Sequence, residues 1–283
     1  MHFSHPLTQL FFNRSSILLC MLLTYPLTLF AKDFATVQNE AYFSIMDCST
    51  RLPLAVVYVI STDKANAKRY PSYIDDPVLL AQKPNCHPQT QHRFKTYQSV
   101  LTHLGIDENY DVGHLAMSNH MDDSPAKSKL ANQFSNLAPQ SAKMNRRGGA
   151  WYQTEMILEC LRDQEPLVVV AGTIDDPSTV SKDWFLDSFN QTTPDFFYRF
   201  VYFTLSDTYK TWLIPNDDSA TKEKLESGAY DISLGQLDAL LPIKMELFQQ
   251  HLKANTPVAS PFFLETKVGS RELTCLGKTT SLS

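Results

Sequence analysis

Four polar side chains follow one another in a short run near the middle of this 283-residue chain: His114, Asn136, Asn145 and Glu155. A neutral imidazole can take a proton from water near pH 7. An amide oxygen can ligate a hard cation, and a carboxylate can orient the water molecules around it. Together these groups could hold one hydrated divalent cation and activate one water molecule, which is the chemistry that phosphodiester hydrolysis requires.

None of the four residues predicts a site when it is considered alone. A single His is more often structural than catalytic. Asn136 alone is typical of a turn ahead of Pro139, and Asn145 alone is typical of a helix N-terminus. The prediction therefore depends on the order and spacing of the whole set, because several residue types have to agree.

The elements that must position these side chains form one local unit of the sequence. A strand is predicted over residues 110–118, which places Gly113 beside the histidine, and a partner strand over 132–138 ends at Pro139. From about 148 to 161 the apolar residues recur at helical spacing, which predicts a helix with one apolar face. Two strands followed by a helix would then carry the polar set.

The rest of the chain predicts a larger sheet around this unit. The run 53–61 is rich in β-branched residues and predicts a buried strand. Apolar runs at 196–205 and 209–214 flank three polar residues and predict a hairpin, whereas the Pro-rich stretch 62–93 predicts a long loop. Strands at 41–47 and 166–171 and helices at 94–105 and 234–252, the last interrupted by Pro242, complete the prediction. This mixture indicates an α+β fold around a central sheet.

The N-terminal residues are expected to be removed from the mature protein. An apolar run over 17–31 follows Arg14 and is broken by Pro26, which is typical of a secretory signal peptide covering residues 1–31. The run is too short and too interrupted to predict a membrane span. An uncleaved N-terminal anchor is the alternative interpretation.

The remaining residues, 32–283, are expected to form a single domain without a membrane span, in a secreted or periplasmic location. Its core is predicted over about 40–252, with a loose tail from about 254. The formal net charge is −5, and it becomes −6 when the signal peptide takes Arg14 away. An acidic protein does not hold polyanions by bulk charge, so any nucleic-acid binding must come from a local basic patch and a metal.

Four cysteines remain after the predicted signal peptide, and an even number in an exported chain favours two disulfides. Three pairings are possible. The pairs Cys48–Cys86 and Cys160–Cys275 are preferred, because the first joins neighbouring segments and leaves the second to hold the tail. Four free thiols in a chain that is never exported are the alternative. No CxxC spacing is present, so a zinc site is not indicated.

The motifs around the polar set resemble those of a known family. They are Asp111-Val112-Gly113-His114, then Asn136-Leu137-Ala138-Pro139-Gln140, then Asn145, Trp151 and Glu155, with Arg69 in the early loop. The chain is similar here to the DNA/RNA non-specific endonucleases of the ββα-metal fold, a group that includes secreted sugar-non-specific nucleases and mitochondrial endonuclease G. The resemblance extends over roughly residues 40 to 250. It implies a central antiparallel sheet with flanking helices that carry a ββα-metal active-site unit.

The resemblance also implies roles for the residues of the set. His114 is the expected general base. Asn145 is the expected direct ligand of Mg²⁺, which Mn²⁺ could replace, and Glu155 would orient the water molecules of the ion. Asn136 would hold His114 or a phosphate oxygen, and Arg69 would clamp the phosphate.

The sequence departs from the family pattern in two places. The family motif reads Asp-Arg-Gly-His, but Val112 stands where the motif has Arg. Arg69, Arg146 or Arg147 could replace the lost charge. Asp111 is expected to shape the turn that presents His114 and to be one of the substrate-binding residues, with Arg146 and Arg147. The spacing between Asn145 and Trp151 is also about two residues longer than usual, which would turn an α-helix by about 200°. A bulge at the two glycines ahead of the helix is expected to absorb the extra length.

The sequence therefore predicts an exported, Mg²⁺-dependent endonuclease that cuts DNA and RNA without strong sequence preference and needs no stable protein partner. Two alternatives remain open. The first is a nuclease-fold binding protein whose hydrolysis has been weakened or lost through Val112. The second is a phosphodiesterase that acts on small substrates.

Overall fold

A computed structural model describes residues 33–62, 65–88, 96–176, 182–206 and 208–243, and the backbone of 271–275 and 278–282. The predicted signal peptide and most of the predicted loose tail lie outside these residues. None of the helices in the described part of the chain combines the length and the apolar character needed to cross a bilayer.

The main structure is a six-stranded sheet in which every neighbouring pair of strands is antiparallel, in the order β1-β2-β3-β6-β7-β8. Its strands are β1 (Phe34–Gln38), β2 (Phe43–Asp47), β3 (Leu52–Ile60), β6 (Leu167–Ile174), β7 (Phe196–Phe203) and β8 (Thr208–Pro215). The helices are α1 (Pro77–Gln82), α2 (Tyr97–Leu104), α3 (Pro125–Leu130), α4 (Ala142–Asn145), α5 (Ala150–Leu161), α6 (Leu186–Phe189), α7 (Lys222–Glu226) and α8 (Leu234–Leu240). Three short 3₁₀ helices are η1 (Pro84–Cys86), η2 (Ser118–Met121) and η3 (Phe134–Asn136). A hairpin of β9 (Arg271–Cys275) and β10 (Lys278–Leu282) completes the described elements.

The sheet is buried on both faces, which explains the continuous apolar runs of its central strands. On β6, Val169 and Ala171 pack in the core cluster that also contains residues of α5. Their neighbours Val168 and Val170 point to the other face and pack in the cluster that contains Leu237 of α8. Side chains alternate between the faces of a strand, so burial on both sides leaves no polar position in the middle of β6.

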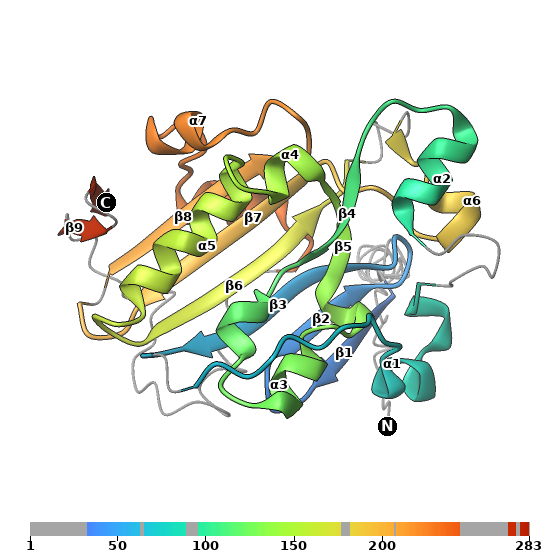
Figure 1. Cartoon of the computed structure of the whole chain (residues 1–283), viewed down its shortest axis with the longest axis horizontal. Coiled ribbons are helices and arrows are strands. Elements are labelled where there is room, and N and C mark those ends of the chain that lie inside the picture. The colour runs from blue at the N-terminus through green and yellow to red at the C-terminus, as the bar shows by residue number, and fades with distance from the viewer. Residues whose placement is uncertain are drawn as a thin grey trace, which may run out of the picture. The chain divides into compact units, whose positions relative to one another are not determined.

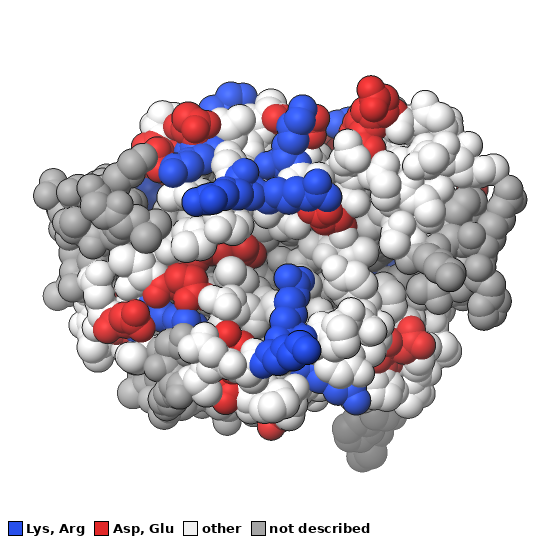
Figure 2. Space-filling view, in the orientation of Figure 1, with Lys and Arg blue, Asp and Glu red and all other residues white. Residues whose placement is uncertain are grey.

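The local unit that carries the polar set is a separate two-stranded sheet followed by two helices. The strands β4 (Tyr110–His114) and β5 (Leu137–Ser141) pair antiparallel, and α4 follows β5 directly. Helix α5 lies over the six-stranded sheet, as Figure 1 shows, and its Trp151 ring is 5.3 Å from the Phe197 ring of β7. Figure 2 shows Lys and Arg side chains on two sides of a hollow on this face, near α4 and near the segment that precedes α1.

Most predicted strands are confirmed, namely the buried strand β3, the strand β6 and the β7–β8 hairpin. The prediction for the second strand of the local unit was wrong, because β5 begins at Leu137 and continues through Pro139. Proline lacks an N–H and cannot donate to a strand partner. It is tolerated here because β5 has a partner on one side only. The edge strand β1 was not predicted at all.

Two other predictions agree with the structure only in part. The stretch 62–93 is not only loop, since it contains α1, whose first turn is capped by the carboxylate of Asp76 accepting from the N–H groups of Val78 and Leu79. The predicted helix 234–252 ends at Leu240, ahead of Pro242, and most of its remainder lies outside the described residues.

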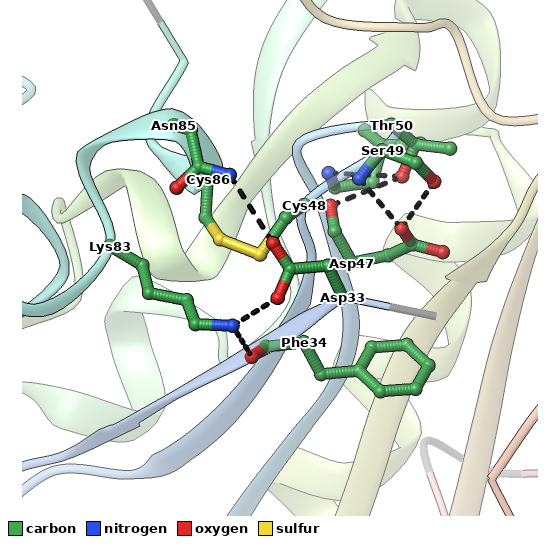
Figure 3. The surroundings of a disulfide bond; sticks show 10 residues. Asp33, Phe34, Asp47, Cys48, Ser49, Thr50, Lys83, Asn85 and Cys86 are labelled. Atoms are coloured by element: carbon green, nitrogen blue, oxygen red, sulfur yellow. Dashed lines mark hydrogen bonds and ion pairs between the residues drawn. A yellow bond between two sulfur atoms is a disulfide. The ribbon is translucent and has the colours of Figure 1, made fainter. Parts of the chain in front are cut away.

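The predicted disulfide between Cys48 and Cys86 is present (Figure 3) and joins the end of β2 to η1. Beside it, the Asp33 carboxylate accepts hydrogen bonds from Lys83 and Asn85, which connects the start of β1 to the same loop. Cys160 is also disulfide-bonded. Its predicted partner, Cys275, has a side chain outside the described part of the structure.

Candidate functional site

A cavity of about 690 Å³ opens where β4, α4 and α5 meet the segment that precedes α1. Five of the eight predicted site residues line it: Arg69, Asp111, His114, Asn145 and Glu155. The cavity thus brings together side chains that lie up to 86 positions apart in the sequence, from Arg69 to Glu155. The other three, Asn136, Arg146 and Arg147, are not among the residues that line the cavity.

His114 is buried at the end of β4, and its ring is held in one orientation. Its Nε2 lies 2.8 Å from Oδ1 of Asn132, whose amide nitrogen donates to the carbonyl of Tyr70 at 3.0 Å. Because that amide oxygen can only accept, Nε2 must carry the hydrogen, and Nδ1 is left as the proton acceptor. Nδ1 is therefore the nitrogen of His114 that can act as a base.

Burial lowers the pKa of His114 to about 4, although the hydrogen bond to Asn132 acts in the opposite direction and the charge of Arg69 adds to the lowering. The imidazole is consequently neutral near pH 7. An anionic phosphate in the cavity would raise this pKa again, because an opposite charge favours the protonated ring. His114 is thus free to accept a proton and becomes more basic when a phosphate is close.

Asn136 was predicted to hold His114 or a phosphate oxygen, and the first of these two roles is wrong. Its Oδ1 accepts from the N–H of Ala116 at 2.7 Å, and its Nδ2 donates to the carbonyls of Ala116 and Ala131 at 2.9 and 2.8 Å. The fully buried amide uses its hydrogen-bonding groups on the backbone that follows β4 and the backbone that precedes η3. Asn136 therefore connects two backbone segments. Asn132, four positions earlier, is the residue that contacts the histidine. The only sequence signal for Asn132 is that spacing of two asparagines.

Asn145 lies at the end of α4, and a hydrogen bond to Asp111 orients its side chain. Its Nδ2 donates to Oδ2 of Asp111 at 3.1 Å, so its Oδ1 is the group available to a ligand in the cavity. Asp111 also accepts two hydrogen bonds from Arg146, at 3.0 and 2.7 Å. The Arg146 guanidinium therefore neutralises the charge of the Asp111 carboxylate.

Glu155 lies on α5 and is buried beside a positive charge that the sequence did not predict. Nη2 of Arg199, a fully buried residue of β7, lies 3.8 Å from Oε1 of Glu155. The Arg199 guanidinium also stacks 3.8 Å from the Trp151 ring and donates to Thr154 at 2.5 Å. Burial raises the pKa of Glu155 to about 7, although Arg199 and Arg69 act against the rise.

Glycines determine how α4 and α5 are connected. Gly148 has a φ of +95°, which disfavours residues with a side chain. A Cβ on Gly149 would lie 2.1 Å from the carbonyl oxygens of Lys143 and Met144. The chain therefore makes a glycine turn before α5 begins, and Asn145 and Glu155 line the same cavity.

The donor set suits a hydrated, oxygen-preferring cation. Asn145 offers an amide oxygen, and Glu155 offers a carboxylate in the same cavity. Among the described residues, the only three His, Cys, Asp or Glu groups close enough to share an ion are Asp33, Cys48 and Cys86, and both of those cysteines are in the disulfide. A metal at the cavity would therefore keep most of its water and be held by few protein atoms.

The chain resembles known proteins in its sequence family and in its fold. The model of the DNA/RNA non-specific endonuclease family matches residues 27–240. The fold is similar to that of a chain in a crystal structure titled as the EndoG/EndoGI complex and the mechanism of EndoG inhibition. That match has 14% sequence identity, covers 73% of this chain and 83% of the other, and has a TM-score of 0.53. No curated protein gives a significant match.

The fold and the family match define the class of this protein: it is a nuclease, a phosphodiester hydrolase. The chain belongs to the DNA/RNA non-specific endonuclease family.

Proposed function

We propose that this nuclease is an exported, Mg²⁺-dependent enzyme in which Nδ1 of His114 activates the attacking water. The observation that carries the proposal is the His114–Asn132 hydrogen bond, because it fixes the tautomer that leaves Nδ1 unprotonated. The low pKa of the buried ring keeps it neutral near pH 7. A neutral, oriented imidazole in a cavity with Asn145 and Glu155 is suited to general-base catalysis.

The metal is proposed to bind through Oδ1 of Asn145, with Glu155 accepting hydrogen bonds from its water molecules. When bound, Mg²⁺ would neutralise charge on the reacting phosphate and on the leaving oxygen. Asp111 holds the Asn145 amide so that its oxygen is available. Arg199 favours the charged form of Glu155, but burial still raises the pKa of Glu155 to about 7, so the carboxyl group is about half protonated near neutral pH before a cation binds.

Binding of DNA and RNA is proposed to depend on local positive charge, since the chain as a whole carries −5. Arg69 is exposed and lines the cavity. Arg146 and Arg147 are exposed next to α4, on the other side of the site. The basic side chains on two sides of the hollow in Figure 2 fit a phosphate backbone that passes between them. Val112 contributes no charge, so Arg69 is the proposed phosphate contact.

Two observations support export. The N-terminal sequence has the pattern of a signal peptide. The Cys48–Cys86 disulfide is of the kind that persists in oxidising compartments. A secreted or periplasmic location is therefore proposed.

The function is tested by incubating the purified protein with plasmid DNA and with RNA, in Mg²⁺ and in EDTA. The matched variants are His114→Ala and His103→Ala, because His103 lies on α2, is exposed and does not line the cavity. Cleavage of both substrates is expected to need Mg²⁺ and His114 and to be unaffected at His103. Metal-dependent cleavage that persists in His114→Ala would refute the mechanism.

Two other results would favour the alternatives that Val112 and the acidic charge leave open. Tight binding of DNA without turnover would indicate a binding protein on a nuclease fold. Hydrolysis of small diesters in preference to long nucleic acids would indicate a phosphodiesterase.

A further inference from the structure

A second cavity, of about 530 Å³, adjoins the candidate active site. Its walls are largely aromatic and include Tyr73, Tyr97, Phe134 and Phe189. Tyr73 and Val112 line both cavities, so they form the wall between the catalytic groups and this aromatic pocket. This wall, called the Tyr73 partition below, therefore includes Val112, the residue that stands where the family motif has an arginine.

Tyr73 is held in place on that partition. It is 45% exposed, which is high for a large aromatic side chain. Its hydroxyl donates to the carbonyl of Val112 at 3.3 Å, and its ring centroid is 6.1 Å from that of His114. The hydrogen bond uses the polar end of the side chain and leaves the ring available for stacking at the edge of the active site.

The remaining aromatic side chains of the pocket are also fixed by their neighbours. The Tyr97 hydroxyl donates to Gln191 at 2.6 Å, and the Phe189 ring packs edge-on against Tyr97 at 5.2 Å. Phe134 packs edge-on against the ring of His87 at 5.4 Å. A pocket with fixed walls loses little side-chain entropy when it is filled.

The charge of the rim favours a base over a phosphate in this pocket. Asp75 lines it, and the Asp75 side chain is 63% exposed. A carboxylate repels phosphate but can accept a hydrogen bond from an amino group on a base edge. A group with a flat aromatic face and no charge therefore fits the pocket better than a second phosphate.

We propose that the aromatic pocket of Tyr73, Tyr97, Phe134 and Phe189 binds the nucleobase next to the scissile phosphate. This proposal rests on the function proposed above. A base is joined to its phosphate through a single sugar, so a phosphate beside His114 places its base close to the Tyr73 partition. Stacking on aromatic side chains accepts every base, which agrees with cleavage without sequence preference. A base in the pocket must leave its own stack, so single-stranded substrates should be cut faster than duplexes.

The test uses three short single-stranded DNAs in which one linkage is a natural phosphodiester and the others are phosphorothioates. One DNA is intact, one has an abasic nucleotide on the 5′ side of the natural linkage, and one has it on the 3′ side. The wild-type protein is expected to cut one abasic DNA about tenfold less efficiently in kcat/KM than the intact DNA, the scale of a lost base–aromatic stack.

Two substitutions of Tyr73 assign the effect to the pocket. Tyr73→Ala should cut the intact DNA about as poorly as the wild type cuts the affected abasic DNA, and should no longer distinguish the two. Tyr73→Phe keeps the ring and should retain the discrimination. Tyr73 is partly exposed, so loss of folding is not expected, and an unchanged circular dichroism spectrum and Tm confirm this.

The results separate this proposal from the proposed function. Equal cleavage of all three DNAs by an active wild type, or discrimination that survives in Tyr73→Ala, would overturn the pocket and leave the nuclease mechanism intact. If the wild type cuts none of the DNAs, fluorescence anisotropy with the same DNAs decides the matter. Weaker binding of an abasic DNA to wild type but not to Tyr73→Ala would support the pocket, and equal binding would overturn it.

Discussion

Oδ1 of Asn132 lies 2.8 Å from Nε2 of His114 and thereby determines which nitrogen of the ring is protonated. The hydrogen bond connects two residues 18 positions apart, one at the end of β4 and one just after α3. Asn132 is itself oriented by the carbonyl of Tyr70. The base is thus positioned by a chain of two hydrogen bonds that ends on the backbone.

Asn132→Ala should lower kcat by about tenfold to a hundredfold, the range found for partners that orient metal-ligating histidines, with a smaller change in KM. The ring would lose its preferred tautomer and orientation. Kinetics with a single-stranded DNA substrate measure the split between kcat and KM, and ¹⁵N NMR of labelled histidine reports the tautomer. Asn119→Ala is the control, because Asn119 lines the cavity but donates to Glu159 and not to the histidine. An unchanged kcat together with a changed tautomer would show that orientation by Asn132 is not needed.

The lowered pKa of His114 predicts how stability depends on pH. The folded ring has a pKa of about 4 against an ordinary value of 6.5, so the unfolded chain binds more protons between these values. The free energy of unfolding should therefore fall as pH falls from about 6.5 towards 4, and this contribution should be constant above 6.5. His120, whose pKa burial also lowers, acts in the same direction. Urea unfolding in EDTA across this range should show a smaller fall for His114→Gln than for wild type, and parallel curves would contradict the prediction.

The buried pair of Glu155 and Arg199 should be coupled in stability. Arg199→Met is expected to cost roughly 3 kcal/mol, the low end for a buried charge that loses its partner, because Glu155 can take a proton. The loss should be larger above pH 7, where the unpaired carboxylate has to ionise. Adding Glu155→Gln to Arg199→Met should recover part of the stability. Urea unfolding of the two single variants and the double variant measures the coupling, and simple additivity would show that the two side chains are independent.

The turn between α4 and α5 should tolerate no side chain at Gly149. A Cβ there would lie 2.1 Å from two backbone carbonyl oxygens, so Gly149→Ala must move α4 relative to α5. Asn145 and Glu155 would then separate, and Mg²⁺-dependent cleavage should fall by at least about a hundredfold, since small misplacements of reacting groups cost that much. Gly235→Ala is the control, because a Cβ on Gly235 would meet nothing within 4 Å and alanine favours the helix α8. Normal activity of Gly149→Ala would show that this turn does not determine the site.

Local patterns in the sequence determined a large part of this protein. β-branched runs predicted β3 and β6, and two apolar runs around a polar turn predicted the β7–β8 hairpin, because strand formation follows from residues close together in the chain. The order and spacing of His114, Asn145 and Glu155 also predicted that they lie together, and all three line one cavity. The glycines predicted the turn ahead of α5, since conformational freedom is a property of the single residue.

Only the tertiary structure decided which side chains meet. Asn132 rather than Asn136 contacts His114, because the backbone around η3 turns one amide towards the ring and the other towards Ala116. Arg199 lies on β7, 44 positions beyond Glu155 in the sequence. Its guanidinium lies near the Glu155 carboxylate because α5 packs on the face of β7. Contacts of this kind depend on how elements pack and in which direction each side chain points, and neither can be read from the spacing of residues along one element.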